Sequence, residues 1–171
     1  MGSTTTLAVF GCIAGFIGTA TAIHLARHVY AKGHAFEEAQ ELAQGKGIIN
    51  IGAGPHRTLG AQIMAENPSV AANVDIVPDG LPNFIQLDIE KEPLPFPDKQ
   101  FGCTFASHIL EHLDNWQFAL DEMVRVADHV MTVLPHPCSV GGWINPGHKQ
   151  HFSVDDIDEI VNLYPNVTIY Y

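Results

Sequence analysis

Glycine and acidic residues follow two predicted strands at the points where those strands end. Gly52 and Gly54 come at the end of the apolar run Gly47–Ile51, and a helix is predicted soon after them. Glycine permits a tight turn and a close ligand approach, and the first N–H groups of a helix can bind an anion. Asp75 lies near the end of the next apolar run, where a carboxylate commonly accepts hydrogen bonds from ribose hydroxyls. The third glycine position of the dinucleotide fingerprint holds Arg57, which disfavours a nicotinamide dinucleotide.

An alternation of strands and helices would position these residues. The predicted strands are Gly47–Gly52, Val70–Val77, Phe84–Ile89, Phe101–Ser107, His129–Leu134 and Val167–Tyr171. The predicted helices are Ala35–Gln44, Thr58–Glu66, Asn115–Ala127 and a last one that begins after its cap, Ser153. This order predicts an α/β, Rossmann-like fold, with a mainly parallel sheet of about six strands, flanking helices and a ligand site beyond the carboxyl ends of the strands. Only Pro78–Asn83 joins the second and third strands, which is too short for a crossover helix.

Three linked motifs between the third strand and the following helix identify a family. Asp88 ends the third predicted strand, the letters PLPFPDKQF follow at residues 93–101, and SHILEHL follows at residues 107–113. In this order they resemble the class I S-adenosylmethionine-dependent methyltransferases, in particular the short domains whose second and third strands are closely linked. The resemblance covers about residues 46–153. It implies S-adenosylmethionine as the cofactor.

The resemblance also assigns the cofactor-binding residues, which are Asn50, Gly52, Gly54, Asp75, Asp88 and Ser107. Gly52 and Gly54 would face the methionine part of the cofactor. Asp75 would bind the ribose, and Asp88 would accept a hydrogen bond from the adenine amino group. The backbone near Ser107 would close the site. The family usually has an acid where this chain has Asn50, and an amide can accept a hydrogen bond but lacks the charge that favours an ammonium group.

His108 and His112 are the candidate catalytic residues, because an imidazole can act as a general base near neutral pH. With Glu111 they also form the H-x-x-E-H pattern of inverted zinc proteases. The methyltransferase family has the same letters without a metal, so no metal site is expected. The His-, Pro- and Gly-rich loop at residues 134–152 is expected to lie over the mouth of the cofactor pocket.

The N-terminal segment is predicted to be a membrane anchor. No charged side chain occurs from Thr4 to Ala26, a length that spans a bilayer core as a helix. Two rows of small residues at helical spacing predict packing against other transmembrane helices, from partner subunits or from a second copy. Arg27 and Lys32 flank the C-terminal side, so the N-terminus should lie outside and the following domain on the cytoplasmic or equivalent side. Gly33 is expected to interrupt the helix, which divides the chain into an anchor at residues 1–32 and a methyltransferase-like domain at residues 33–171.

Composition narrows the range of partners. The chain has 171 residues and a formal net charge of −11, so it would repel a phosphate backbone and no nucleic acid partner is expected. Two functions remain from the sequence. The first is a membrane-anchored S-adenosylmethionine-dependent methyltransferase, for which the bilayer makes a lipid, quinone or membrane-protein substrate plausible. The alternative is a catalytically inactive methyltransferase-like subunit with a structural or assembly role in a membrane complex, which the altered glycine motif and small size favour.

Overall fold

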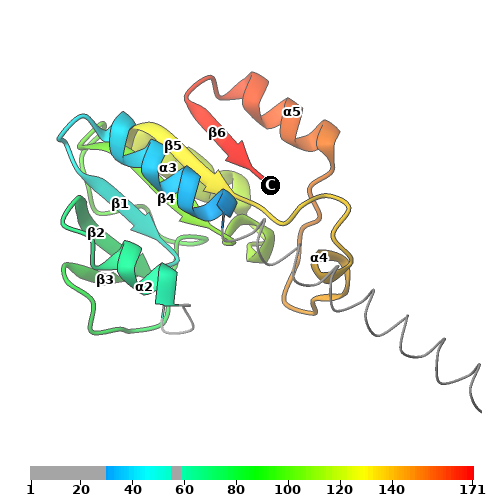
Figure 1. Ribbon diagram of the computed structural model, residues 1–171, viewed down its shortest axis with the longest axis horizontal. Helices are drawn as coiled ribbons and strands as arrows, with labels where there is room; N and C mark the ends of the chain where they lie inside the picture. Colours follow the sequence, from blue (N-terminus) through cyan, green and yellow to red (C-terminus); the bar gives the residue numbers. More distant parts are fainter. Residues whose placement is uncertain (1–29, 55–58) are drawn as a thin grey trace, which may run out of the picture.

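A computed structural model describes residues 30–54 and 59–171, and it contains a six-stranded parallel sheet (Figure 1). The strands are β1 (Ile48–Ile51), β2 (Val70–Asp75), β3 (Phe84–Gln86), β4 (Phe101–Ser107), β5 (Ala127–Val133) and β6 (Val167–Tyr170). The helices are one at residues 30–43, α2 (Leu59–Ala65), the 3-10 helix η1 (Leu110–His112), α3 (Trp116–Val126), α4 (Val140–Ile144) and α5 (Val154–Leu163). The predicted Rossmann-like α/β architecture is therefore confirmed.

The strand order β3-β2-β1-β4-β5-β6 places a switch point between β1 and β4. The chain runs outward from β1 to β3, returns to β4 beside β1, and then runs outward to β6 on the other side. In open parallel sheets, ligands bind beyond the carboxyl ends of the strands at such a point. The connection from β2 to β3 contains no helix, as its length predicted, yet the two strands pair in parallel.

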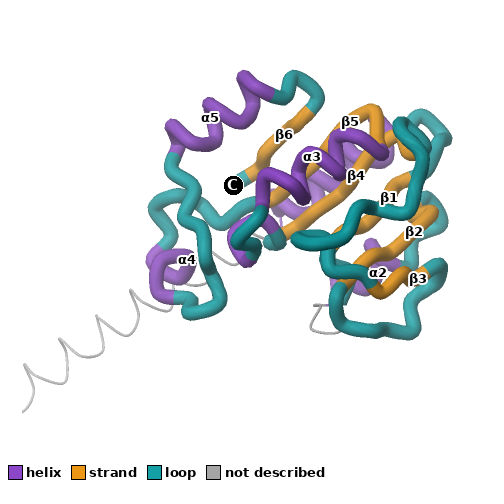
Figure 2. The backbone as a smooth tube through the Cα atoms, turned by 180° about the vertical axis from the view of Figure 1, so that it is seen from behind, coloured by secondary structure: helices purple, strands orange, loops and turns teal. Residues whose placement is uncertain are grey.

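The two faces of the sheet are covered by different helices. Figure 1 shows the helix at residues 30–43 in front of the sheet, and Figure 2, seen from behind, shows α3 over the opposite face. Ala35, Phe36 and Ala39 of the first helix are buried against one side of the sheet, where the Phe36 and Phe105 rings meet edge to face at 5.2 Å. Leu120 and Met123 of α3 are fully buried in the larger core on the other side. Every strand except the edge strands is thus enclosed on both faces.

The prediction that Gly33 interrupts the first helix is wrong, because the helix at residues 30–43 runs through it. A glycine inside a helix costs only about 1 kcal/mol relative to alanine. The burial of the following apolar residues, from Ala35 to Ala43, outweighs that cost. The helix does end where the sequence predicted, since Gln44 and Gly45 both have positive φ angles, of 48° and 82°. The helix that contains Gly33 therefore continues without a break into the described domain.

The segment before β4 is fixed to α3 by hydrogen bonds. Glu122 of α3 accepts the backbone N–H of Leu94 at 2.8 Å and two guanidinium hydrogen bonds from Arg125. Arg125 also donates to the carbonyls of Leu94 and Phe96 and to the carboxylate of Asp98. These contacts raise the pKa of Arg125 and lower that of Glu122 below its usual 4.5. The PLPF-D motif therefore has a structural role. Its hydrogen bonds to Glu122 and Arg125 form a brace that positions β4.

Side chains hydrogen-bond to backbone groups at the ends of two predicted helices. Ser153 caps α5 in a capping box, since its hydroxyl accepts the Asp156 N–H and the Asp156 carboxylate accepts the Ser153 N–H. The carboxyl end of α3 passes into β5 with no intervening loop. The Lys99 ammonium donates to the carbonyls of Val124 and Ala127 there, at 2.7 Å each, and so satisfies helix-end acceptors.

Within residues 30–54 and 59–171, no helix combines the length and the apolar character that a membrane crossing requires. The predicted anchor, Thr4–Ala26, lies outside the described residues, as do residues 55–58, which include Arg57.

Candidate functional site

A cleft of about 720 Å³ lies at the carboxyl ends of β1, β2 and β4, on the side predicted for the ligand. Five of the six predicted cofactor residues line it, namely Gly52, Gly54, Asp75, Asp88 and Ser107. Both predicted catalytic residues, His108 and His112, line it as well. The sequence therefore located the residues of one cleft, although they come from five separate segments of the chain.

Asp75 connects the turn after β1 to the end of β2. One carboxylate oxygen, Oδ2, accepts the Gly54 N–H at 2.7 Å, and Oδ1 accepts the Val77 N–H at 2.8 Å. A Cβ on Gly54 would lie 2.6 Å from Oδ2, so the glycine allows this contact. The two backbone bonds hold the carboxylate at the cleft wall and leave each oxygen with further acceptor capacity. A ribose hydroxyl could therefore donate to Asp75 without disturbing the turn.

Gly52 lines the cleft and also lies against Ile109. Its φ of +76° is favourable only for glycine, and a Cβ there would lie 1.9 Å from Cδ1 of Ile109. The space beside Gly52 is thus occupied by an apolar side chain that itself lines the cleft. Ile109 is a site residue that sequence reasoning missed, because the contact joins two loops with no pattern in common.

Asp88 lies at the cleft beyond β3, with a side chain that is 16% exposed. Its carboxylate forms an ion pair with the Lys91 ammonium at 2.6 Å, and it also accepts the Glu90 N–H at 3.1 Å. The hydrogen bond from Lys91 is the main reason why the pKa of Asp88 is lowered from its usual 3.8. Asp88 is therefore held in its charged, hydrogen-bond-accepting form.

Asn50 lines a small pocket that shares Lys32, Gly52 and Ser107 with the cleft, and it does not line the cleft itself. Its side chain is buried in β1 and donates to the Asn73 Oδ1 at 2.9 Å, and Asn73 donates in turn to the carbonyls of Ala65 and Pro82. This chain of amides ties β1 and β2 to the loop before β3. The amide that stands in place of the family's usual acid thus has a structural partner, which the sequence did not indicate.

The end of β4 and the residues after it contribute Ser107, His108 and His112 to the cleft. The Ser107 hydroxyl oxygen is buried and has no hydrogen-bond partner among the described residues. His108 follows with a φ of +58°, a strained conformation for a residue other than glycine. Its Nδ1 lies 2.9 Å from Oε1 of Glu111, while Nδ1 of His112 lies 2.8 Å from the Gly147 carbonyl oxygen. The two predicted catalytic histidines therefore have different partners.

Lys32 is the second site residue that sequence reasoning missed. It belongs to the helix at residues 30–43, lines the cleft near Gly52 and Ser107, and is half-buried. Burial lowers the pKa of its ammonium group. From the sequence, Lys32 was interpreted only as a basic residue that follows the predicted anchor. The cleft thus has a cation near the glycine turn, whereas the carboxylates of Asp75 and Asp88 lie at the ends of β2 and β3.

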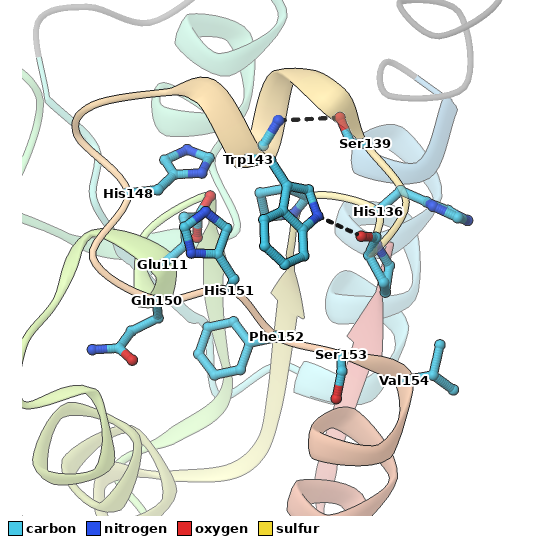
Figure 3. Close-up of a pocket in the computed structure, with 13 residues that line it drawn as sticks. Glu111, His136, Ser139, Trp143, His148, Gln150, His151, Phe152, Ser153 and Val154 are labelled. Atoms are coloured by element: carbon cyan, nitrogen blue, oxygen red, sulfur yellow. Dashed lines mark hydrogen bonds between the residues drawn. The ribbon is translucent and has the colours of Figure 1, made fainter.

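A separate pocket of about 170 Å³ lies beside the cleft (Figure 3). The loop at residues 134–152 forms much of its wall, with His136, Trp143 and His148 among the lining residues. None of this loop's residues lines the cofactor-sized cleft, so the prediction that the loop lies over that mouth is wrong. The reason is that the loop is bonded to η1, because the N–H groups of Lys149 and Gln150 both donate to the Glu111 carbonyl.

Comparison with known families agrees with this geometry. Residues 49–129, just under half of the chain, match the family model described as a methyltransferase domain. The match supports a class I S-adenosylmethionine-dependent methyltransferase-like family, whose members generally bind S-adenosylmethionine. Neither curated proteins nor solved structures give a match. The matched segment runs from β1 to β5 and so contains all of the predicted cofactor residues.

Proposed function

We propose that the chain binds S-adenosylmethionine in the cleft at the switch point and transfers its methyl group to an acceptor. One observation supports the proposal above all others. The cleft of about 720 Å³ unites Asp75, Asp88 and Ser107 within the segment that matches a methyltransferase domain. A pocket of a few hundred to a thousand cubic ångströms is typical of cofactor sites. The cleft therefore has the size and the polar groups that this cofactor needs.

The charges in the cleft fit the two ends of the cofactor. Asp75 and Asp88 offer acceptors to ribose hydroxyls and to the adenine amino group. Lys32, near the glycine turn, offers a cation to the carboxylate of the methionine part. The cofactor supplies an electrophilic methyl group when it is bound. The chain's task is then to align an acceptor with that methyl group, and His108 on the cleft wall is placed to take up the proton that the acceptor loses.

Calorimetric titration of S-adenosylmethionine into the purified full chain tests the proposal. We expect binding to one site, and Asp75→Asn should weaken it by about 10–100-fold, since a hydrogen bond to a charged group contributes about 1.5–3 kcal/mol. Asp155→Asn, an exposed change in α5 away from the cleft, should leave the affinity unchanged. A chain with a native circular dichroism spectrum that gives no heat at millimolar ligand would contradict the proposal. That result would favour the inactive structural subunit, in which Ile109 beside Gly52 serves packing alone.

We further propose that the enzyme is anchored in a membrane through Thr4–Ala26, with the domain on the cytoplasmic or equivalent side. The support is the uncharged character of that run and the basic residues that follow it. We expect the expressed chain to stay in the membrane fraction after washing with alkaline carbonate. A variant with two leucine or alanine positions of the run changed to aspartate, such as Leu7→Asp with Ala14→Asp, should be released. Release of the unaltered chain by the wash would overturn the anchor.

A further inference from the structure

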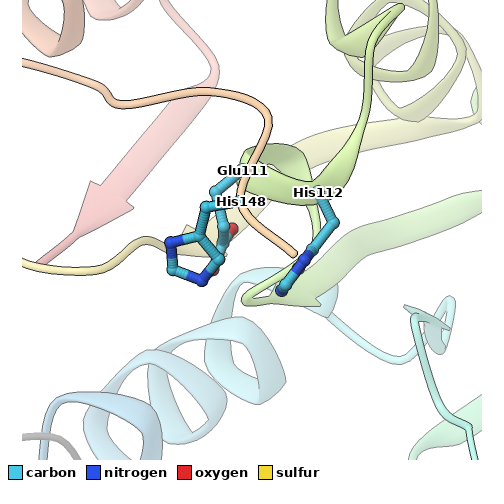
Figure 4. A group of neighbouring side chains, drawn as sticks. All are labelled: Glu111, His112 and His148. Carbon is cyan, nitrogen blue, oxygen red and sulfur yellow. The ribbon is translucent and has the colours of Figure 1, made fainter. Parts of the chain in front are cut away.

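A glutamate and two histidines meet between the cleft and the smaller pocket. Glu111 and His112 belong to η1, His148 lies in the loop after α4, and one potential ligand atom from each lies within 4.8 Å of the others (Figure 4). His112 lines the cleft, whereas Glu111 and His148 line the smaller pocket. We infer that these three side chains bind a divalent transition metal ion of the zinc type. The inference does not depend on the proposed methyltransferase activity.

Glu111 supplies an acceptor that the fold itself does not use. Its side chain is 1% exposed, and Oε1 lies 2.9 Å from Nδ1 of His108. The other oxygen, Oε2, is buried and has no hydrogen-bond partner in the described part of the chain. A buried carboxylate oxygen without a partner is costly, and a cation at Oε2 would remove that cost. The pair with His108 would meanwhile orient the ligand, as outer partners of metal ligands commonly do.

His112 is held in the tautomer that a metal ligand requires. Its Nδ1 lies 2.8 Å from the carbonyl oxygen of Gly147. A carbonyl oxygen can only accept, so Nδ1 carries the proton and Nε2 presents its lone pair. Metal-binding histidines almost always donate their second ring nitrogen to a carbonyl or a carboxylate in this way. The arrangement of His112 is therefore already that of a ligand.

His148 is brought to the group by hydrogen bonds that do not involve its own ring. The backbone N–H groups of Lys149 and Gln150 donate to the Glu111 carbonyl at 2.8 and 3.0 Å. Together with the bond between Gly147 and His112, they hold this loop against η1. The neighbouring cation does not compete for the site, because the Lys149 ammonium pairs with Asp114 at 2.6 Å. The third ligand is thus positioned by the fold.

The ligand set selects the kind of metal. Two imidazoles and one carboxylate suit zinc and related transition metals, whereas magnesium and calcium prefer oxygen ligands alone. A tetrahedral zinc site with bonds of about 2.0–2.2 Å needs ligand atoms roughly 3.3 Å apart, which side-chain rotation can reach from the observed spacing. Three protein ligands leave a fourth coordination position open. That position would lie where the cleft and the smaller pocket approach each other.

The test uses Zn²⁺ alone, titrated into the full chain in competition with a chromogenic chelator. We expect one tight Zn²⁺ site per chain. His148→Ala should weaken Zn²⁺ binding by at least about 100-fold, because loss of a ligand should cost no less affinity than loss of a residue that only contacts a ligand. His148→Ala lies in a loop and should keep the native circular dichroism spectrum. His34→Ala, which removes an exposed histidine from the first helix, is the matched control and should bind as the unaltered chain does. Equal Zn²⁺ affinity in the His148→Ala and unaltered chains would overturn the site.

Cobalt substitution identifies the ligands directly. Co²⁺ bound by nitrogen and oxygen should give visible d–d absorption without a thiolate charge-transfer band. Such a band would mean that a cysteine, such as the exposed Cys138, binds the metal, and the proposed ligand set would be wrong. Neither measurement uses S-adenosylmethionine, so failure of the metal site and failure of cofactor binding are distinguishable.

Discussion

Gly102→Ala should lower the free energy of unfolding by about 3 kcal/mol, at the upper end of the usual cost of overpacking. Gly102 lies in β4, directly beneath the end of the first helix. A Cβ built there would lie 2.0 Å from the carbonyl oxygen of Ala43 and 2.4 Å from its Cα. Because these are backbone atoms, no side-chain rotation can relieve the clash. The helix must move off the sheet, and the burial of Phe36 against Phe105 is then lost as well.

Equilibrium denaturation of the full chain, followed by circular dichroism, measures this effect. Gly80→Ala is the matched control, since Gly80 is exposed and a Cβ there meets nothing within 4 Å. It should change the free energy of unfolding by no more than about 0.5 kcal/mol. If the two variants unfold at the same denaturant concentration, then β4 and the first helix are not packed as the structure has them. The result matters for function because Lys32 reaches the cleft from this same helix.

Much of the fold could be predicted from local pattern. The strands at the centre of the sheet are largely apolar, and Ile48–Ile51 is buried at every position, because helices cover both faces. The start of α5 at its cap Ser153 and the end of the first helix before Gly45 could also be predicted. Each depends on the residue's own hydrogen bonding or backbone conformation. The error at Gly33 has the opposite origin. Tertiary packing of the residues after it decided the outcome, and a local propensity does not record that packing.

The candidate site was predictable where a residue type has a known use at the end of a strand or within a family motif. Asp75 and Asp88 were located because a carboxylate at a strand end has a known use. Ile109, Lys32 and His148 were not, because each meets the site through a contact between segments far apart in the sequence. The H-x-x-E-H letters match a zinc-binding pattern, but the methyltransferase family has the same letters without a metal, so the sequence did not predict one. The third ligand comes from a loop whose position depends on hydrogen bonds to the Glu111 carbonyl.

The brace between α3 and the segment before β4 should make the stability of the fold depend on pH. Arg125→Met, which replaces the aliphatic part of the side chain but not the guanidinium group, removes two bonds to the Glu122 carboxylate, at 2.7 and 2.8 Å, and three to other acceptors. Glu122 is then a nearly buried charge with only the Leu94 N–H as a partner. Breaking one side of such a pair costs about 3–5 kcal/mol, so we expect a loss of about 3 kcal/mol at pH 7. Asp98→Asn is the control, because Asp98 is 76% exposed and its pair with Arg125 should contribute less than about 1 kcal/mol.

The pH dependence separates this charge effect from a simple loss of packing. In the unaltered chain Arg125 holds the pKa of Glu122 below 4.5, its usual value. A depressed carboxyl pKa stabilises the folded chain above the unfolded pKa, and that stability is lost as the pH falls through the folded pKa. In Arg125→Met the guanidinium hydrogen bonds, which are the largest cause of the lowered pKa of Glu122, are gone. The Leu94 N–H bond and the desolvation of the carboxylate remain, and desolvation raises the pKa. Acid should therefore neutralise the unpaired Glu122, and the difference in unfolding free energy between the two chains should narrow as the pH falls from 7 towards 4.5. A difference that stays constant over this range would mean that Arg125 acts through packing alone. In that case the double variant Glu122→Gln with Arg125→Met should be no more stable than Arg125→Met.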